Sequence, residues 1–234
     1  MNCGVSALVN NQGMYDYNNM QLIKMLLVKG GVLFDIGANI GSFTLIAAEQ
    51  NQAKVVAFEP HPRTFAILSH NVQLNEYHNV TLVNCAVGSQ NSQVFLSDKP
   101  SSSINSIQNG PGKYTIEVPG IRIDDYCAEN DIQPDLIKID IEGFEFDALL
   151  GFGDFLRKAK LIFIEQNGLA NERSRGDVEI NDLLLSNGYC GPFKVDFDHR
   201  KFHRHIEANG EDSIFINHQY AESLRDKYGY TFED

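Results

Sequence analysis

The chain has 234 residues, 43% of them hydrophobic and 21% charged, and a formal net charge of −12. This composition is ordinary for a globular protein with one large domain and a substantial core. The acidic balance argues against nucleic-acid binding, which depends on a basic face. We expect no membrane span and no signal peptide, because no apolar run is long enough for either. The scattered cysteines predict reduced thiols in a cytoplasmic protein: Cys3, Cys85, Cys127 and Cys190.

Helix and strand patterns alternate along most of the chain. The first is a helix over 15–29 with a 3.6-residue apolar period, which Gly30 and Gly31 end. Apolar strands that alternate with helices predict an α/β fold with a doubly wound, mostly parallel sheet and helices on both faces. We expect strands at 32–36, 55–59, 80–84, 136–141 and 161–166, and further helices at 41–50, 62–75, 143–150 and 177–187.

Two regions interrupt this alternation. Residues 88–125 contain no predicted helix, only strand-like pieces at 93–96 and 115–118 around the serines at 101–103. An insertion of this length usually covers a site or is mobile. From Gly188 the pattern predicts a terminal β-hairpin, with strands at 193–197 and 213–216. The expected division is an N-terminal arm and helix (1–30), a main domain (31–217) and a C-terminal extension (218–234).

The turn after the first strand has the pattern Asp35-x-Gly37-x-x-x-Gly41, which predicts a nucleoside site. Glycine lets the backbone approach a ligand closely. A carboxylate two residues before Gly37 would repel the pyrophosphate of a dinucleotide and attract a cation. We therefore favour S-adenosylmethionine over NAD as the ligand, with Asp35, Gly37, Asn39 and Gly41 at the binding turn. The alternative is an ordinary tight strand-to-helix turn.

The next two strands end on polar residues at the same edge of the sheet. Glu59, followed by Pro60, can accept hydrogen bonds from two ribose hydroxyls, as the acidic residue does in dinucleotide folds. Asn84 follows the third strand, where its side chain either faces the adenine edge or forms a turn. We expect Glu59 and Asn84 to complete the cofactor site.

A second candidate site lies in residues 136–145. Here an apolar strand delivers Asp140 and Glu142 to its carboxyl end, where open α/β sheets bind ligands. The two side chains leave the strand on one face because they are two residues apart. Crowded carboxylates indicate a raised pKa or a shared cationic partner. The alternative for the pair is helix N-capping, and Glu145 suits the first turn of the following helix.

These segments resemble the FkbM family of S-adenosylmethionine-dependent methyltransferases. The resemblance rests on residues 34–41, 58–60, 123–126 and, most specifically, 138–145, and it covers roughly residues 30–217. It implies a Rossmann-like, seven-stranded sheet whose last strand is antiparallel. It also implies methyl transfer to a hydroxyl of a sugar, glycan or secondary metabolite. By this resemblance Asp35, Gly37 and Glu59 bind the cofactor, and Asp140 and Glu142 line the reaction site. We also count Asp140 among the cofactor-binding residues.

The end of the fifth strand departs from the family pattern. It reads Glu165-Gln166-Asn167, whereas the family often has a Glu followed two positions later by His. A sugar hydroxyl is a weak nucleophile, and we predict that Asp140, Glu142 or Glu165 accepts its proton. Asp140, Glu165 and Asn167 could instead offer oxygens to Mg²⁺, an alternative that we favour less.

Three functions stay open at this point. The leading one is an O-methyltransferase for a hydroxylated small molecule or glycan. The second is a methyltransferase with a nitrogen or protein acceptor, and the third is a nucleotide- or NAD-binding module without activity. No Asn/Asp-Pro-Pro-aromatic tetrapeptide of amino-directed methyltransferases occurs, which favours a hydroxyl. The basic segment 199–205 is either a solvated hairpin tip or a clamp for an acidic acceptor.

Overall fold

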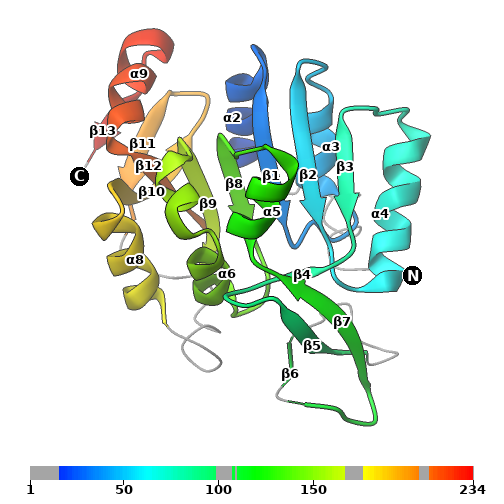
Figure 1. The fold of residues 1–234 in the computed structure, drawn as a ribbon. Helices are drawn as coiled ribbons and strands as arrows, with labels where there is room; N and C mark the ends of the chain where they lie inside the picture. The colour runs from blue at the N-terminus through cyan, green and yellow to red at the C-terminus, as the bar shows by residue number, and fades with distance from the viewer. Residues whose placement is uncertain (1–15, 99–106, 109, 167–175, 206–210, 234) are drawn as a thin grey trace.

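The computed structural model describes residues 16–98, 107–108, 110–166, 176–205 and 211–233, and a nine-stranded sheet runs through its middle (Figure 1). In chain order its strands are β1 (Gly31–Ile36), β2 (Ala53–Phe58), β3 (Val80–Val83), β8 (Leu136–Ile139), β9 (Leu161–Gln166), β10 (Tyr189–Asp196), β11 (Lys201–Arg204), β12 (Glu211–Asn217) and β13 (Thr231–Glu233). Across the sheet they follow the order β13-β11-β10-β12-β9-β8-β1-β2-β3.

Seven of these strands form the expected doubly wound arrangement. β3, β2, β1, β8 and β9 are parallel neighbours, with β1 at the centre between β2 and β8. β12 is antiparallel to both β9 and β10, as predicted for the last strand. The mostly parallel α/β sheet with an antiparallel C-terminal strand is therefore confirmed. Each of its five parallel strands lies within two residues of its predicted position.

The sheet has two strands more than the expected seven, because the C-terminal region is more than a hairpin. β10 pairs with β12 as predicted, but the segment between them adds β11 to the other edge of β10. Phe202 explains this difference, since its ring is fully buried against Phe193 and Phe232. β13 lies in the expected C-terminal extension and pairs with β11, so residues 218–233 pack onto the same sheet.

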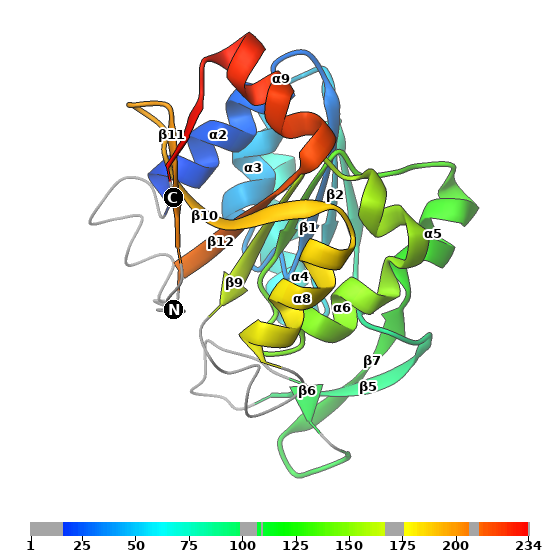
Figure 2. The ribbon, with the colours of Figure 1, turned by 90° about the vertical axis from the view of Figure 1, so that its left-hand side faces the viewer.

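Helices cover both faces of the sheet, as the apolar strands predict. One face carries α2 (Tyr17–Leu27), α3 (Ser42–Ala48), α4 (Pro62–Leu74) and α9 (His218–Tyr228). The other carries α5 (Ile123–Asn130), α6 (Glu145–Gly151), the short 3₁₀ helix η1 (Gly153–Lys158) and α8 (Asp177–Ser186), and Figure 2 shows the sheet between the two layers. α5 and α9 were not expected. Because α5 begins at Ile123, the prediction that no helix occurs in 88–125 is wrong at its end.

The expected insertion forms a second, smaller sheet below the carboxyl ends of the large one (Figure 1). Its strands are β4 (Ala86–Val87), β5 (Ser92–Ser97), β6 (Ile107–Gln108) and β7 (Thr115–Ile121), and β5 and β7 contain the two predicted strand pieces. Asp98, just after β5, lies 3.2 Å from His61 Nε2 and also pairs with Arg63. The small sheet therefore docks next to the loop that follows β2. The serines at 101–103 and the arm at 1–13 lie outside the described residues.

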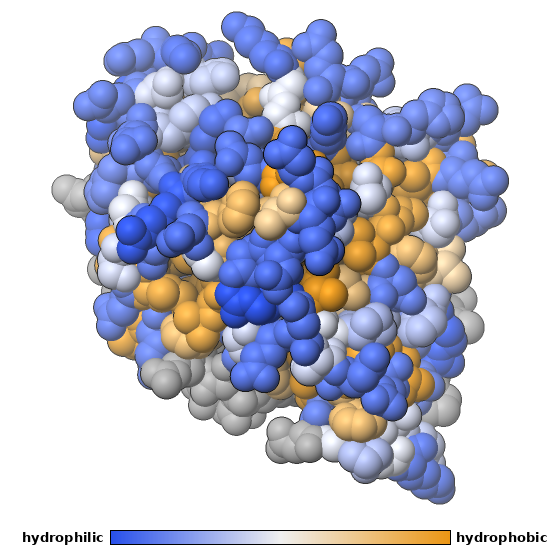
Figure 3. Space-filling view, viewed as in Figure 1, coloured by the Kyte–Doolittle hydropathy of each residue, from blue (hydrophilic) through white to orange (hydrophobic). Residues whose placement is uncertain are grey.

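The outer face over α5, α6 and α8 is mixed in character. Leu150, Val178 and Leu185 are exposed there, and Figure 3 shows apolar areas interrupted by hydrophilic side chains. Within the described part of the chain, we find no helix with the length and apolar character that a membrane crossing requires. Cys85, Cys127 and Cys190 are free thiols.

Candidate active site

The turn after β1 is built around glycine and presses against the end of β8. Gly37 has φ +81°, and a Cβ placed on it would lie 1.9 Å from the backbone oxygen of Asp140. Its amide and that of Ala38 both donate to the Phe58 carbonyl, at 2.9 and 3.0 Å. Gly41 has φ +101°, where L side chains are strained. The predicted glycine turn is therefore required by a backbone contact between two loops at the carboxyl edge of the sheet.

Glu59 lies in the loop after β2 with only 7% of its surface exposed. Its carboxylate accepts hydrogen bonds from the backbone amides of Asn39 (3.0 Å) and His61 (2.9 Å). Burial raises the pKa of Glu59 to about 7, although these two hydrogen bonds oppose the shift. The carboxylate is thus fixed in orientation, and its other lone pairs can serve further donors such as ribose hydroxyls.

The side chain of Asn84 stabilises the backbone of this loop. Its side-chain amide donates to the carbonyls of Glu59 (2.8 Å) and Pro60 (3.0 Å). The Asn84 nitrogen therefore holds the backbone that carries Glu59. Contact of Asn84 with adenine stays a prediction.

Asp35 ends β1 inside the protein, with 2% of its surface exposed. Thr44 Oγ1 donates to its Oδ2 at 2.5 Å. Burial raises the pKa of Asp35 to about 6, against the effects of the Thr44 hydrogen bond and the Lys138 charge. Asp35 and Lys138 occupy paired positions on β1 and β8.

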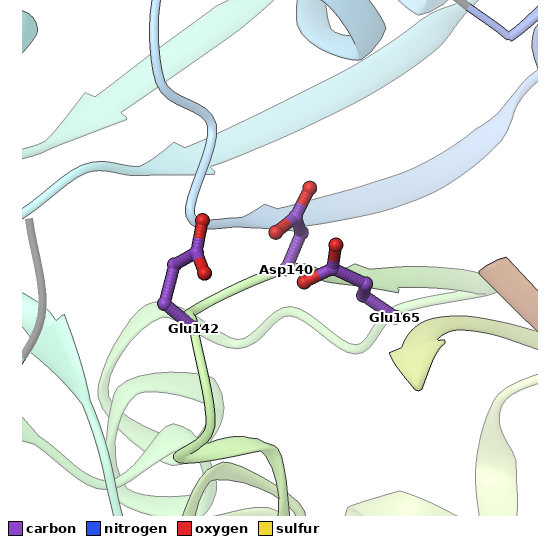
Figure 4. A group of neighbouring side chains, drawn as sticks. All are labelled: Asp140, Glu142 and Glu165. Carbon is purple, nitrogen blue, oxygen red and sulfur yellow. The ribbon is translucent and has the colours of Figure 1, made fainter. Parts of the chain in front are cut away.

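Three carboxylates converge at the ends of β8 and β9 (Figure 4). Asp140 and Glu142 follow β8, Glu165 comes from β9, and one oxygen of each lies within 4.8 Å of the others. Glu142 has φ +59°, which helps to turn its side chain toward this point. Glu145 stabilises the turn by accepting from the amides of Ile141 (3.2 Å) and Gly143 (3.0 Å). The three predicted acidic residues are thus close together.

The surroundings of Glu165 favour its protonated form. Burial is the largest cause, and together with the charges of Asp140 and Glu142 and a hydrogen bond with Asp140 it raises the pKa of Glu165 to about 9. Crowded carboxylates share a proton because they cannot all ionise at low cost. A cationic ligand beside them would favour release of that proton.

Two residues at this site were missed from sequence. Lys138 of β8 and Asp212 of β12 form a buried ion pair of 3.2 Å, and Lys138 Nζ also lies 3.5 Å from Asp140 Oδ2. Lys138 interrupts an apolar strand, Leu136-Ile137-Lys138-Ile139, that is buried on both faces. A charge at such a position needs a partner, and that signal was present in the sequence.

The basic segment 199–205 is largely engaged by nearby groups. His199 pairs with Asp196, while Lys201 and His203 both pair with Glu233. Arg200 donates to the Tyr228 carbonyl at 2.8 Å. These contacts do not support the clamp for an acidic acceptor.

The sequence matches a known protein family. Residues 35–190, more than half of the chain, match the model of the "Methyltransferase FkbM domain". The chain belongs to the FkbM methyltransferase family. The family and the fold together imply S-adenosylmethionine as the cofactor, which confirms the resemblance seen in the sequence.

Relatives of known name match at low identity. Methyltransferase 1 of Beauveria bassiana is 30% identical over 145 residues, which are 52% of this chain and 58% of that protein. The hexuronic acid methyltransferase AglP of Haloferax volcanii is 28% identical over 149 residues, 62% of this chain and 60% of that one. The 2-O-methyltransferase NoeI of Sinorhizobium fredii is 27% identical and covers 70% of this chain and 74% of that one. The chain thus spans about three fifths of the length of the first two.

A solved structure shows the same fold. It is a "putative caffeoyl-CoA O-methyltransferase" from Staphylococcus aureus, with a TM-score of 0.52 and 14% identity. The match covers 92% of this chain and 93% of that chain.

The described residues fit the cofactor that the family implies. Gly37 and Gly41 have positive φ angles that glycine adopts without strain, which fixes the turn that the proposed cofactor site uses. Glu59 offers a fixed carboxylate for vicinal hydroxyls, and Asp35 and Asp140 supply negative charge for a sulfonium or ammonium group. The predicted binding roles of Asp35, Gly37, Asn39, Gly41, Glu59 and Asp140 remain proposals.

The buried acids predict how stability depends on pH. The pKa values of Asp35, Glu59 and Glu165 are raised to about 6, 7 and 9, so the native chain holds these protons longer than the unfolded chain. Stability from these groups is present at low pH and is lost as pH rises through those values. We expect the Tm of the ligand-free protein to fall between pH 6 and 9. Glu165→Gln should flatten the fall above pH 7.5, because glutamine does not ionise.

Thermal unfolding at half-unit steps of pH measures this effect. Glu129→Gln on exposed α5 is the matched control and should keep the parental slope. A Glu165→Gln slope equal to the parental one would contradict the proposed ionisation.

Proposed function

We propose that the protein is an S-adenosylmethionine-dependent O-methyltransferase that acts on a hydroxyl of a sugar, glycan or other hydroxylated small molecule. The observation that carries this proposal is the juxtaposition of the Glu59 and Asp35 binding turn with the Asp140–Glu142–Glu165 cluster. Both lie at the carboxyl edge of the parallel strands, where such sheets bind ligands. The names of AglP and NoeI, a hexuronic acid methyltransferase and a 2-O-methyltransferase, support a sugar acceptor.

The protein itself has little covalent chemistry to perform in this reaction. When bound, S-adenosylmethionine supplies a methyl group whose bond to the sulfonium breaks as the acceptor oxygen bonds to carbon, which neutralises the sulfur and releases the hydroxyl proton. The chain's part is to align the two ligands and to accept that proton. We assign this task to Asp140, because its side chain is 31% exposed and lies beside Glu165 and Glu142.

Glu165 and Asp140 together can accept the proton that the acceptor hydroxyl releases. Before ligands bind, burial and the charges of Asp140 and Glu142 favour a proton on Glu165. A positive ligand would favour loss of this proton to solvent, which leaves the pair able to accept one from the acceptor hydroxyl. Glu142 lines the same point and completes the negative surface.

The first test is binding. Calorimetry should detect association of S-adenosylmethionine and S-adenosylhomocysteine, whereas NAD should give no heat and no thermal shift. Association with NAD alone would favour the nucleotide-binding module instead. The same measurement identifies the cofactor without knowledge of the acceptor.

The second test is transfer. Methyl glycosides of a neutral hexose, a deoxyhexose and a hexuronate serve as acceptors, with methyl-labelled cofactor in single-turnover reactions and an amine and a peptide as the nitrogen alternatives. Asp140→Asn and Glu165→Gln should lower the rate about 100-fold while cofactor affinity stays within about threefold. Glu129→Gln should transfer at the parental rate. If Asp140→Asn, Glu142→Gln and Glu165→Gln all do so too, the assigned roles are wrong.

We propose that transfer needs no metal. The converging carboxylates could attract Mg²⁺, but the charge of Lys138 already offsets part of theirs, and the raised pKa of Glu165 favours its neutral form. EDTA should leave the transfer rate unchanged, and added Mg²⁺ should not raise it. Loss of activity in EDTA that Mg²⁺ restores would show instead that the carboxylates act through an ion.

A further inference from the structure

Lys138 occupies an unusual place for a charged side chain. It lies in the middle of β8, between Asp35 on β1 and Phe163 on β9, and only 2% of its side chain is exposed. Its ammonium nitrogen lies 5.1 Å from the centre of the Phe43 ring on α3. Leu136 and Phe163, which lie next to Lys138 on the same face of β8 and β9, are buried apolar residues. Such a position is costly for a charge without partners.

Its partners are carboxylates that differ in their access to solvent. Lys138 Nζ lies 3.2 Å from Asp212 Oδ1 and 3.5 Å from Asp140 Oδ2. The Asp212 side chain is 9% exposed, whereas that of Asp140 is 31% exposed. Lys138 therefore links a buried acid in β12 to an acid at the ligand-accessible strand end. Lys194 donates to the Asp212 carbonyl at 2.8 Å.

The charge of Lys138 is maintained by this surrounding. Burial alone would lower the pKa of Lys138, but Asp212, Asp140 and Asp35 raise it above its usual value. The charge of Asp16, before α2, also acts on Asp212, and the charge of Lys138 acts on Glu165 across the cluster. The ammonium thus stands among acids that come from β1, β9, β12 and the loop after β8, where Glu142 also lies.

We propose that Lys138 is a positioning residue: anchored by Asp212, its ammonium holds the Asp140 carboxylate beside Glu165 and Glu142. Three carboxylates with oxygens within 4.8 Å of one another repel when ionised, and a nearby positive charge opposes that repulsion. This role rests on the proposed function, because Asp140 serves an acceptor hydroxyl only if the chain transfers a methyl group.

The competing explanation is a purely structural ion pair. Removing one partner of a buried pair destabilises a protein, so loss of folding in a single variant would not separate the two. Lys138→Met keeps most of the length of the side chain and removes its charge. Lys138→Met combined with Asp212→Asn removes both charges of the buried pair and should restore much of the stability that the single variant loses.

The test uses ligand-free protein with ¹³C-labelled Asp and Glu carboxyl groups. NMR titration from pH 5 to 11 follows the ionisation of the cluster, with signals assigned by Asp140→Asn and Glu165→Gln. We expect the midpoint of the Glu165 signal to rise by about one pH unit in Lys138→Met, because the charge of Lys138 lowers the pKa of Glu165. The midpoint should also rise in the double variant, but by less. Lys194→Met, which removes another charge next to Asp212, should give the parental midpoint.

Two results would overturn the proposal. One is a Glu165 midpoint that stays at its parental value in the folded double variant while Tm falls, since a structural ion pair predicts this. The other is an equal shift in Lys194→Met. The titration needs no cofactor, so its outcome is independent of the binding test. A shifted midpoint in a chain that binds no S-adenosylmethionine refutes the proposed function alone, whereas binding with an unshifted midpoint refutes this role of Lys138 alone.

Discussion

Gly37→Ala should abolish measurable S-adenosylmethionine binding and lower the free energy of unfolding by about 3 kcal/mol or more. The added Cβ would lie 1.9 Å from the Asp140 backbone oxygen, and this backbone atom cannot move aside as the end of a flexible side chain could. The backbone at φ +81° is itself strained for alanine. To relieve the contact, the loop after β1 must move away from the loop after β8. These two loops carry the proposed cofactor turn and the acidic cluster, so both would be displaced together.

Gly88→Ala is the matched control for this prediction. It is the same change just after β4 of the small sheet, but nothing lies within 4 Å of the added Cβ and the backbone angle is ordinary. Denaturant unfolding and calorimetry of both variants measure stability and affinity. Gly88→Ala should change stability by less than about 1 kcal/mol. A Gly37→Ala protein that binds the cofactor as the parent does would show that the turn plays no part in the site.

The sequence predicts the framework of this site because the framework depends on local patterns. Apolar strands that end at Asp35, Glu59 and Asp140 place those residues at one edge of a parallel sheet, whatever the details of packing. The requirement for Gly37 is also visible locally, as a glycine between a strand and a helix. What its conformation permits, contact with a loop 103 residues later, is visible only in three dimensions.

Residues whose role depends on distant partners were harder to predict. Lys138 and Asp212 are 74 positions apart and meet only because β12 enters the sheet antiparallel beside β9. Neither has a motif spacing that would bring the two together. Asn84 was placed correctly at the sheet edge, but its hydrogen bonds to the Glu59 and Pro60 carbonyls follow from the fold of the loop.

The C-terminal region departs from prediction for a similar reason. Lys201–Arg204 is mostly basic and predicts a solvated turn, yet Phe202 is buried and its neighbours pair with Glu233. One apolar residue in a polar segment is a weak local signal. It becomes decisive only when the aromatic residues of β10 and β13 lie beside it.

Glu59→Gln should weaken S-adenosylmethionine binding about 100-fold and also loosen the cofactor loop. Both Glu59 oxygens accept backbone amides, from Asn39 and His61. A glutamine keeps one acceptor and turns an NH₂ group toward the other amide, donor against donor. It also takes away the negative charge offered to ribose hydroxyls, and hydrogen bonds to a charged group contribute about 1.5–3 kcal/mol each. Calorimetry gives the affinity, and thermal unfolding gives the stability.

The prediction separates a binding role for Glu59 from an ordinary structural role. Asn84→Ala removes the side chain that supports the same loop through two carbonyls, without any change to the Glu59 carboxylate. If Glu59 binds the ribose, Glu59→Gln should lose far more affinity than Asn84→Ala at a comparable loss of Tm. Equal losses of affinity in the two variants would mean that loop order alone matters. In that case the carboxylate would have no direct contact with the cofactor, and the acidic residue after β2 would serve only to join the two loops.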